Sequence, residues 1–494
     1  MDAPAHPLVL PEQRTLFYGG DWRAPHAESW TDVLNPATGA LLARVAEGRA
    51  ADADAAVAAA REGFALWRSV PPLERARTLR AAAEVLRRHA TELAMLDAAD
   101  CGNPVAEMGS DVMVAAALFD FFAGLVTEMK GASIPMGPQA VNFSVREPLG
   151  VVARIVAFNH PLLFAAGKLA APLAAGNAVI IKPPEQAPLS ALRLAELIGK
   201  LFPSGVFNLL PGGRDVAGAL AAHPGVAMIT LVGSVPTGRA VMRAAADTLK
   251  PVLLELGGKN ALIACADADP DEVAAAAVTG MNFTWCGQSC GSTSRAFVHE
   301  AIHDAVVARI PHHVARFRPG LPTDPATTMG ALISAAQQAR VQDHIAAARA
   351  EGARLICGGG SGAEDPALAG GWFTPATVFT DVTPEMRLAR EEVFGPVLAV
   401  LRWSDEAAML NAVNALEYGL TCAIWTDDLE TAHRLAGAVD AGFVWVNEVG
   451  RHFLGAPFGG VKQSGIGREE CLGELLAFTR EKNIHIRLRR PRAA

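Results

Sequence analysis

Hydrophobic and polar positions alternate along the chain with two different periods. Residues 51–101 place Ala and Leu against Arg and Glu at helical spacing, which predicts exposed amphipathic helices. From residue 150 onward, short apolar runs alternate with helical stretches, and a second such series spans about 259–450. The runs are GVVARIVAF, NAVIIKP, VFNLLPGG and MITLVGS in the first series, and ALIACAD, RAFVH, VLAVLRW, CAIWT and GFVWVN in the second. Strand–helix–strand units predict an α/β fold whose parallel sheets bind phosphate-bearing ligands at the carboxyl ends of their strands.

Two segments do not follow this alternation. Ile134–Arg146 is predicted to be extended, and KNIHIRLRRPR at 482–492 is predicted to be a β-strand that ends in basic residues. An exposed strand presents unpaired backbone groups, so the tail is expected to need a partner.

Composition is typical of a large globular protein and excludes several classes of partner. The chain has 494 residues, 51% hydrophobic and 19% charged, which allows about three domains. Its net charge of −8 gives no electrostatic reason to bind nucleic acid or an anionic membrane. No apolar run is long enough to cross a bilayer, and the N-terminus lacks the pattern of a secretory signal.

Cysteine usage argues for a reducing compartment. The seven cysteines are an odd number and thinly spread, which disfavours a disulfide framework and indicates the cytoplasm. Cys286 and Cys290 have no second Cys or His pair at zinc-ligand spacing, so no metal site is expected.

Glycine-rich or charged turns follow three of the predicted strands. They read IIKPPE at 180–185, PGGRD at 211–215 and GSVPTG at 233–238. The last precedes an apparent helix, whose N-terminal N–H groups can hold a phosphate. Each turn alone is more often an ordinary strand–helix connection, but three in series favour a nucleotide site.

Three residues are candidates for chemistry, each with a structural alternative. Glu255 closes an apolar run, where desolvation would raise its pKa toward that of a general base, or it pairs with a cation such as Lys259. Asn159 either caps a helix or points its amide at a developing oxyanion. Cys290 has small neighbours that give a substrate access to its sulfur, whereas Cys286, beside a Trp, fits an inert buried thiol.

Eight short motifs follow one another along the chain in the same order as in a known protein family. They read FNHP (158–161), KPPE (182–185), GSVPTG (233–238), ELGGK (255–259), GQSC (287–290), EEVFGPV (391–397), GFVWVN (442–447) and PFGGVKQSGIGRE (457–469). From about residue 15 to 488, the chain resembles the aldehyde dehydrogenase superfamily, and within it the NAD(P)-dependent, hydrolytic type.

The resemblance implies a mechanism. Cys290 attacks the aldehyde to form a thiohemiacetal, and Asn159 with the Cys290 backbone N–H holds the oxyanion. Hydride transfer to the nicotinamide leaves a thioester, and Glu255 activates the water that hydrolyses it to a carboxylic acid. Lys168 and Glu469 match positions that relay protons from Glu255.

The resemblance also implies the cofactor contacts. A carboxylate at Glu185 accepts hydrogen bonds from a free ribose 2′-hydroxyl and repels a 2′-phosphate, so NAD is expected rather than NADP. The matching positions are Ala157, Phe158, Lys182, Glu185, Gly212, Gly233, Ser234, Gly238, Leu256, Glu392 and Phe394.

The substrate positions are unusually polar. The positions that line the substrate pocket of many relatives read here His160, Thr284, Ser289, His452 and Phe458. Leu163 and Arg451, which adjoins His452, are further candidates for the substrate site. Polar groups around a plain alkyl chain would go unpaired, so we expect a polar or carboxylated aldehyde, such as a carboxybenzaldehyde. Arg451 either clamps that carboxylate or faces solvent or a neighbouring subunit.

The implied architecture has three parts. A Rossmann-type cofactor domain spans 1–125 and 147–258, an α/β catalytic domain spans 259–470, and a small β oligomerisation arm joins 126–146 to 471–494. The arm is expected to build homodimers or homotetramers. Two alternative functions are a coenzyme-A-acylating semialdehyde dehydrogenase, which Glu255 disfavours, and a catalytically silent NAD-binding protein.

Overall fold

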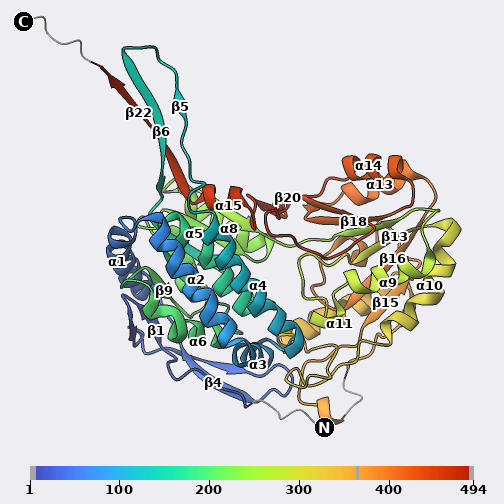
Figure 1. Ribbon diagram of the computed structural model, residues 1–494. Helices are drawn as coiled ribbons and strands as arrows, with labels where there is room; N and C mark the ends of the chain where they lie inside the picture. The colour runs from blue at the N-terminus through green and yellow to red at the C-terminus, as the bar shows by residue number, and fades with distance from the viewer. Residues whose placement is uncertain (1–6, 363–365, 489–494) are drawn as a thin grey trace, which may run out of the picture.

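Two large sheets lie beside each other, and a narrow arm projects from one of them (Figure 1). The computed structural model describes residues 7–362 and 366–488. The first six residues of the predicted cofactor domain and residues 489–494 of the predicted arm therefore lie outside the described part.

The first sheet has eight strands with a parallel centre. Its order is β2 (Asp21–Arg23), β1 (Leu16–Tyr18), β9 (Phe207–Leu209), β8 (Ala178–Lys182), β7 (Val151–Ile155), β10 (Met228–Val232), β11 (Val252–Glu255) and β21 (Gly465–Ile466). Strands β7 to β11 are parallel and almost wholly buried, which explains their continuous apolar runs. The chain moves outward from β7 to β9 and then resumes at β10 on the other side of β7, so the topological switch point lies between β7 and β10.

Helices cover both faces of this sheet. One face carries α1 (Ala50–Trp67), α7 (Arg214–Ala222) and α8 (Val235–Ala246). The other carries α2 (Pro72–Arg88), α3 (Ala90–Cys101), α4 (Val105–Gly124), α5 (Lys168–Ala175) and α6 (Leu189–Ile198). The prediction of exposed amphipathic helices across 51–101 is wrong for α3, whose residues Leu93–Cys101 are all buried because α3 lies against both α4 and α6.

The second sheet has seven strands, all parallel except one edge strand. Its order is β14 (Arg354–Cys357), β15 (Thr377–Thr380), β16 (Val397–Trp403), β13 (Arg295–His299), β12 (Ala261–Ala264), β18 (Thr421–Trp425) and β19 (Phe443–Val446), with β14 antiparallel. Helices α9 (Pro270–Gly280), α10 (Glu300–Val314), α11 (Ala335–Ala350), α13 (Glu406–Asn414) and α14 (Leu429–Ala438) pack around it.

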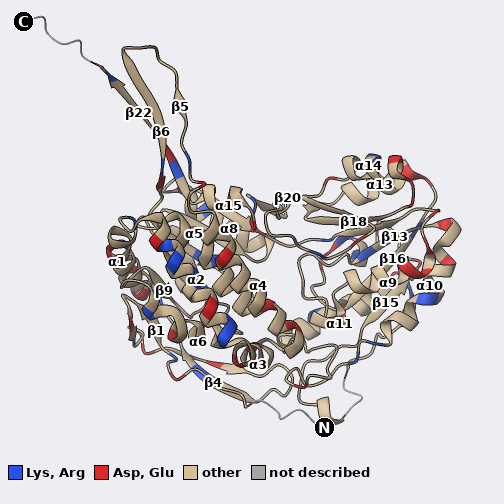
Figure 2. Cartoon of the chain, viewed as in Figure 1, with Lys and Arg blue, Asp and Glu red and all other residues tan. Residues whose placement is uncertain are grey.

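The arm consists of β5 (Ser133–Ile134), β6 (Ala140–Pro148) and β22 (Thr479–Arg487). Strands β6 and β22 pair antiparallel from Pro148↔Thr479 to Ala140↔Arg487, so the predicted tail strand finds its partner within the chain. Charges of both signs meet near the base of the arm, where Glu147 contacts Lys482 at 3.0 Å and Arg480 at 3.5 Å (Figure 2).

The predicted domain boundaries differ from the observed elements at two points. Strand β21 comes from the predicted catalytic segment but pairs with β11 of the first sheet. The predicted second arm segment begins with α15 (Leu472–Ala477), which packs on α5 in the body of the molecule. Within the described residues, no helix is both long and apolar enough to span a membrane.

Candidate active site

A cavity of about 200 Å³ opens at the carboxyl ends of β7, β10 and β11. The first sheet's switch point supplies one wall, as expected for a ligand site in an open parallel sheet. The lining residues are Ala157, Phe158, Asn159, Val232, Gly233, Ser234, Glu255, Leu256, Gly257, Cys290, Gln337, Arg340, Glu392 and Phe394. The cavity therefore brings together residues from segments more than 200 positions apart in the sequence.

Cys290 and Glu255 contact each other in this cavity. Glu255 ends β11 and is only 5% exposed, while Cys290 is half-buried on the loop after α9. The thiol and the carboxylate both line the cavity, and each acts electrostatically on the other. Burial, and then the charge of Glu469, hold the pKa of Glu255 well above its usual range. Burial and the charge of Glu255 likewise raise the pKa of Cys290.

The alternative role for Glu255, a pair with Lys259, is not what the structure shows. Lys259 is buried, and its Nζ has no hydrogen-bond partner among the described residues. Burial, aided by the charge of Arg295, lowers the pKa of Lys259 to about 7, and the acidic neighbours that oppose this effect are Glu392 and Glu391.

Asn260 holds the loop that carries the nucleophile. Its Nδ2 donates to the carbonyl oxygens of Cys290 at 2.7 Å and Ser292 at 3.0 Å, and its Oδ1 accepts from the Thr421 N–H at 3.0 Å. A Cβ on Gly258 would lie 2.6 Å from Asn260 Oδ1, so only glycine fits there. Asn260 was not predicted from the sequence, although a polar residue directly before a buried strand was an available signal.

Hydrogen bonds hold the backbone around Asn159, whereas its side-chain amide makes none to the described residues. Asn103 Nδ2 donates to the Asn159 carbonyl at 2.8 Å, and Asp97 Oδ2 accepts from the Leu162 N–H at 3.1 Å. The Asn159 side chain is 3% exposed, lines the cavity and makes no capping hydrogen bond to the described residues. The Cys290 N–H also has no acceptor within the described chain. Two free donors therefore lie beside the thiol. Asn103 and Asp97 were not predicted, because their partners lie more than 50 residues away.

The two predicted relay residues form part of a buried ionic network. Lys168 Nζ lies 2.5 Å from Glu469 Oε2, and Arg154 contacts Glu469 at 2.7 Å and Glu474 at 3.4 Å. Burial alone would lower the pKa of Lys168, but the carboxylates of Glu469 and Glu474 raise it. Burial raises the pKa of Glu474 to about 7. The charges of Lys168 and Glu469 both act on Glu255, which places the network beside the candidate base.

The turn after β10 leads directly into a helix. Ser234, which lines the cavity, caps α8 by accepting from the Thr237 N–H at 3.4 Å. Because residue 236 is Pro and the Gly238 N–H donates to the Ser234 carbonyl, the Val235 N–H is the one in the first turn that has no acceptor among the described residues. A Cβ on Gly238 would lie 2.6 Å from a methyl group of Leu256, which explains a glycine at this close approach.

A second group of predicted cofactor residues meets beyond the end of β8. Lys182 is 7% exposed, and burial lowers its pKa to about 8 against the opposing charge of Glu185. Glu185 is exposed, and its carboxylate lies close to Gly213. A Cβ added to Gly213 would be only 2.8 Å from Glu185 Oε2. The preceding Gly212 has φ +147°, a conformation that favours glycine. The IIKPPE and PGGRD turns are thus adjacent.

Glu392 and Phe394 close the cavity from the second domain. Glu392 Oε1 accepts from the Gly258 N–H at 3.0 Å, and burial raises the pKa of Glu392 to about 7. Phe394 meets Phe158 edge to face, with ring centroids 5.7 Å apart. Phe394 itself has φ +54°. Gln337 and Arg340, which sequence reasoning missed, hold the carbonyls of Phe394 at 2.7 Å and Glu392 at 2.6 Å.

Two groups of predicted substrate residues contain aromatic contacts. His160 contacts the rings of Phe164 and Trp285 and pairs with Asp111. Leu163, close to His160 in sequence, and Thr284 and Ser289, close to Trp285, are half-buried. The His452 ring lies 4.3 Å from that of Phe458, and its Nδ1 lies 3.2 Å from Glu470.

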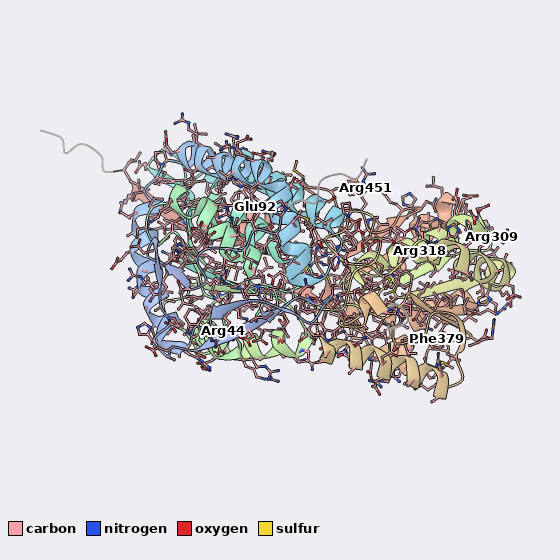
Figure 3. The ribbon with its side chains drawn as sticks, turned by 90° about the horizontal axis from the view of Figure 1, so that it is seen from below. Arg44, Glu92, Arg309, Arg318, Phe379 and Arg451 are labelled. Atoms are coloured by element: carbon pink, nitrogen blue, oxygen red, sulfur yellow. The ribbon has the colours of Figure 1, made fainter. Side chains whose placement is uncertain are left out.

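Arg451 lies at the surface (Figure 3). Its side chain is 66% exposed, contacts Glu448 at 3.4 Å and stacks on Phe453. This exposure agrees with the alternative in which Arg451 faces solvent or a neighbouring subunit. The structure does not place the guanidinium in the cavity that contains Cys290.

Comparisons with known proteins agree with this geometry. The family model described as "Aldehyde dehydrogenase family" matches residues 22–484. Aldehyde dehydrogenase tropH of Talaromyces stipitatus is 52% identical over 98% of this chain and 96% of its own length. A putative aldehyde dehydrogenase from Burkholderia cenocepacia has a TM-score of 0.94 at 39% identity, covering 97% of this chain and 99% of its own. The indole-3-acetaldehyde dehydrogenase AldA of P. syringae, a mutant in complex with NAD+ and IAA, has a TM-score of 0.94 at 36% identity, covering 97% of each chain. The chain belongs to the aldehyde dehydrogenase family.

Proposed function

We propose that this member of the family oxidises an aldehyde to a carboxylic acid with NAD, through a thiohemiacetal and a thioester on Cys290. The observation that carries the proposal is the contact between Cys290 and Glu255 in a cavity that also contains the free amide of Asn159. A nucleophile, a base and an oxyanion donor in one cavity are the parts that acyl chemistry needs.

In the first step Cys290 attacks the aldehyde carbon. The thiol proton passes to Glu255, whose charge acts on Cys290 in the free enzyme. The Asn159 amide and the Cys290 N–H then hold the oxyanion, and neither has to break an existing hydrogen bond to do so.

NAD supplies the hydride acceptor when it is bound. The residues present fit this group: the N-terminus of α8 suits a pyrophosphate, and Glu185 with Lys182 suits ribose hydroxyls. An anionic Glu185 disfavours a 2′-phosphate, and related structures from Bacillus cereus and Pseudomonas are NAD complexes.

Hydrolysis of the thioester is the task of Glu255. Its raised pKa makes it a stronger base than an ordinary carboxylate, and its buried position keeps it close to the acyl carbon. Glu255 has to lose the thiol proton before it can take one from water. The ion pair of Lys168 and Glu469 lies close enough to act on Glu255 electrostatically, which supports a route for both protons through this network.

The substrate is a polar aldehyde, and the chain works as a homo-oligomer in the cytoplasm. The paired polar side chains of His160 and His452 beside aromatic rings support the first statement. All seven cysteines are free, which agrees with a reducing compartment.

The test is NADH absorbance on adding a panel of aldehydes with NAD, with and without coenzyme A. We expect NADH and the free acid, at a rate that coenzyme A does not change. A requirement for coenzyme A would establish the acylating alternative, and the absence of NADH with every aldehyde would favour a silent protein.

A further inference from the structure

The buried ionic network continues beyond the pair of Lys168 and Glu469. Arg154 Nη2 contacts Glu469 Oε1 at 2.7 Å, and Nη1 of the same guanidinium contacts Glu474 Oε1 at 3.4 Å. A guanidinium is a rigid fork of donors that keeps its protons, so Arg154 holds the two carboxylates side by side without carrying a proton itself. The Glu474 side chain, on α15, is 3% exposed. A second enclosed carboxyl group therefore adjoins the one that pairs with Lys168.

From Glu474 the contacts lead to the surface. Its second carboxylate oxygen, Oε2, accepts from the Glu470 backbone N–H at 2.7 Å. The carboxylate of Glu470 in turn lies 3.2 Å from His452 Nδ1, and these two residues form the surface pair. The exposed fraction of the side chain rises in this order, from 3% at Glu474 to 19% at Glu470 and 42% at His452. A continuous series of contacts thus connects the enclosed network with solvent.

Glu470 is fixed in place by its backbone. It has φ +63°, in the left-handed region, which is costly for a residue with a side chain. Its N–H donates to Glu474, and its carbonyl accepts from the Gly455 N–H at 2.8 Å. The charge of Glu470 also acts on Lys168. Glu470 therefore links the buried network to the segment after β19, which carries His452.

The charges around Glu474 allow it to exchange a proton near neutral pH. Burial, and then the charge of Glu469, raise the pKa of Glu474 to about 7, and the cations that oppose this effect are Arg154 and Lys168. An ordinary glutamate is ionised throughout this range. Glu474 can therefore both accept a proton and release it under the conditions in which an enzyme works.

Each half of the proposed reaction leaves one proton in the enclosed site. In the first half, the aldehyde hydrogen leaves as hydride to NAD, the Cys290 sulfur bonds to the acyl carbon, and the thiol proton is set free. In the second half, water cleaves the thioester, which restores the thiol and yields the carboxylate and one proton. Glu255 is 5% exposed and the Glu469 side chain 2%, so these protons need a path to solvent.

We propose that Glu474 carries these protons from Glu469 to the surface pair, and that the surface pair delivers them to solvent. Arg154 is the positioning residue, because one guanidinium holds both carboxylates. In each transfer the O–H bond of one carboxyl group breaks as a bond to the next acceptor forms, directly or through one water molecule. This inference rests on the proposed hydrolysis by Glu255 and extends its proton route.

The test follows hydrolysis of an acyl-enzyme without hydride transfer. Cys290 is acetylated with p-nitrophenyl acetate in the absence of NAD, and the loss of the acetyl group is followed by protein mass at low buffer concentration. We expect the rate constant to fall about 10-fold in Glu474→Gln. Added 2,6-lutidine, a hindered base that can carry a proton but attacks a thioester poorly, should restore the rate. Glu474→Asp, which keeps a carboxyl group, should retain most of it.

Two further variants separate proton transfer from a structural effect. Glu196→Gln is the matched control, because Glu196 is also an enclosed carboxylate paired with an arginine, Arg193, and lies on α6, which bears none of the residues of this route. It should match wild type with and without lutidine. Glu470→Gln should show the same loss and the same rescue as Glu474→Gln, and it provides the test if Glu474→Gln does not fold.

The outcomes distinguish this route from the proposed oxidation. A deacetylation rate in both Glu474→Gln and Glu470→Gln equal to that of wild type, or a loss that lutidine does not reverse, would overturn the route. A wild type that hydrolyses the ester at Cys290 but forms no NADH with any aldehyde would refute the oxidation and leave the route standing. A wild type that never acquires the acetyl group on Cys290 would refute both.

Discussion

Cys290 and Glu255 each make it harder for the other to ionise. Glu255 is buried and Cys290 is half-buried, so both are partly desolvated, and the negative charge of Glu255 adds to the cost of a thiolate. A proton shared by the thiol and the carboxylate leaves the pair with one negative charge instead of two until an aldehyde arrives. The nucleophile is thus protected from side reactions by the base that later hydrolyses the thioester.

This coupling predicts how the reactivity of the Cys290 thiol depends on pH. Replacing Glu255 by Gln removes the charge that raises the pKa of Cys290, so the midpoint for alkylation by iodoacetamide should move to lower pH. The measurement is the alkylation rate of Cys290 against pH, followed by peptide mass. Cys286 is fully buried and should stay unlabelled in both proteins. A midpoint that stays the same or rises in Glu255→Gln would show that the two groups are not coupled.

Helix α3 positions the site through two buried carboxyl groups. Asp97 accepts from the Leu162 N–H, just after Asn159, and Asp100 accepts from the Leu189 N–H at the start of α6 at 2.7 Å. Burial raises the pKa of Asp97 to about 7. The folded protein therefore holds a proton on Asp97 that the unfolded chain has released, between roughly pH 4 and pH 7.

Stability should accordingly fall as pH rises through this range. The cost of ionising Asp97 reaches at most about 4 kcal/mol above pH 7, and Asp97→Asn avoids it while keeping an acceptor for Leu162. The Tm of Asp97→Asn relative to wild type should increase by several degrees between pH 5 and pH 8. Asp247→Asn, at the exposed end of α8, serves as the control and should show no such trend. A difference in Tm that is constant or shrinks with pH would contradict this account.

The local hydrophobic pattern was sufficient to predict the strands, but not to predict how deeply the surrounding helices are buried. The runs at β7, β8 and β10 are apolar throughout because both faces of the sheet are covered, and that signal is local. The burial of α3 depends on α4 and α6, which no window of sequence contains. Likewise Cys290 and Glu255 were identifiable from their motifs, whereas Asp111 was not, because its partner His160 lies 49 residues away.

The two sheets are tied together at the active site. Strand β21 leaves the second half of the chain to pair with β11, bringing Gly465 opposite Glu255 and Glu469 close behind it. Glu392 reaches back to the Gly258 N–H. The base, its ionic network and the cofactor wall thus depend on both halves of the molecule being folded together.

The exposed surface of the arm predicts that the chain assembles into an oligomer. It exposes large apolar side chains, which are Ile134, Met136, Val141, Ile486 and Leu488, each between 38% and 52% exposed. Such residues on a thin projecting sheet suit a second copy of the chain. Sedimentation should therefore show a dimer or tetramer, and removal of residues 480–494 should shift it to a monomer. Removal of 489–494 alone should leave the assembly intact. A monomeric wild type, or an unchanged size after the longer truncation, would be inconsistent with this role of the arm.

The central claim is that Cys290 carries the acyl group and that Glu255 releases it. The most direct measurement is rapid mixing of Glu255→Gln with NAD and an aldehyde that wild type oxidises, followed by mass analysis of the protein. We predict a burst of one NADH per site, slow turnover afterwards, and an acyl adduct on the peptide that contains Cys290. Steady turnover without an adduct, or an adduct on another residue, would contradict the account.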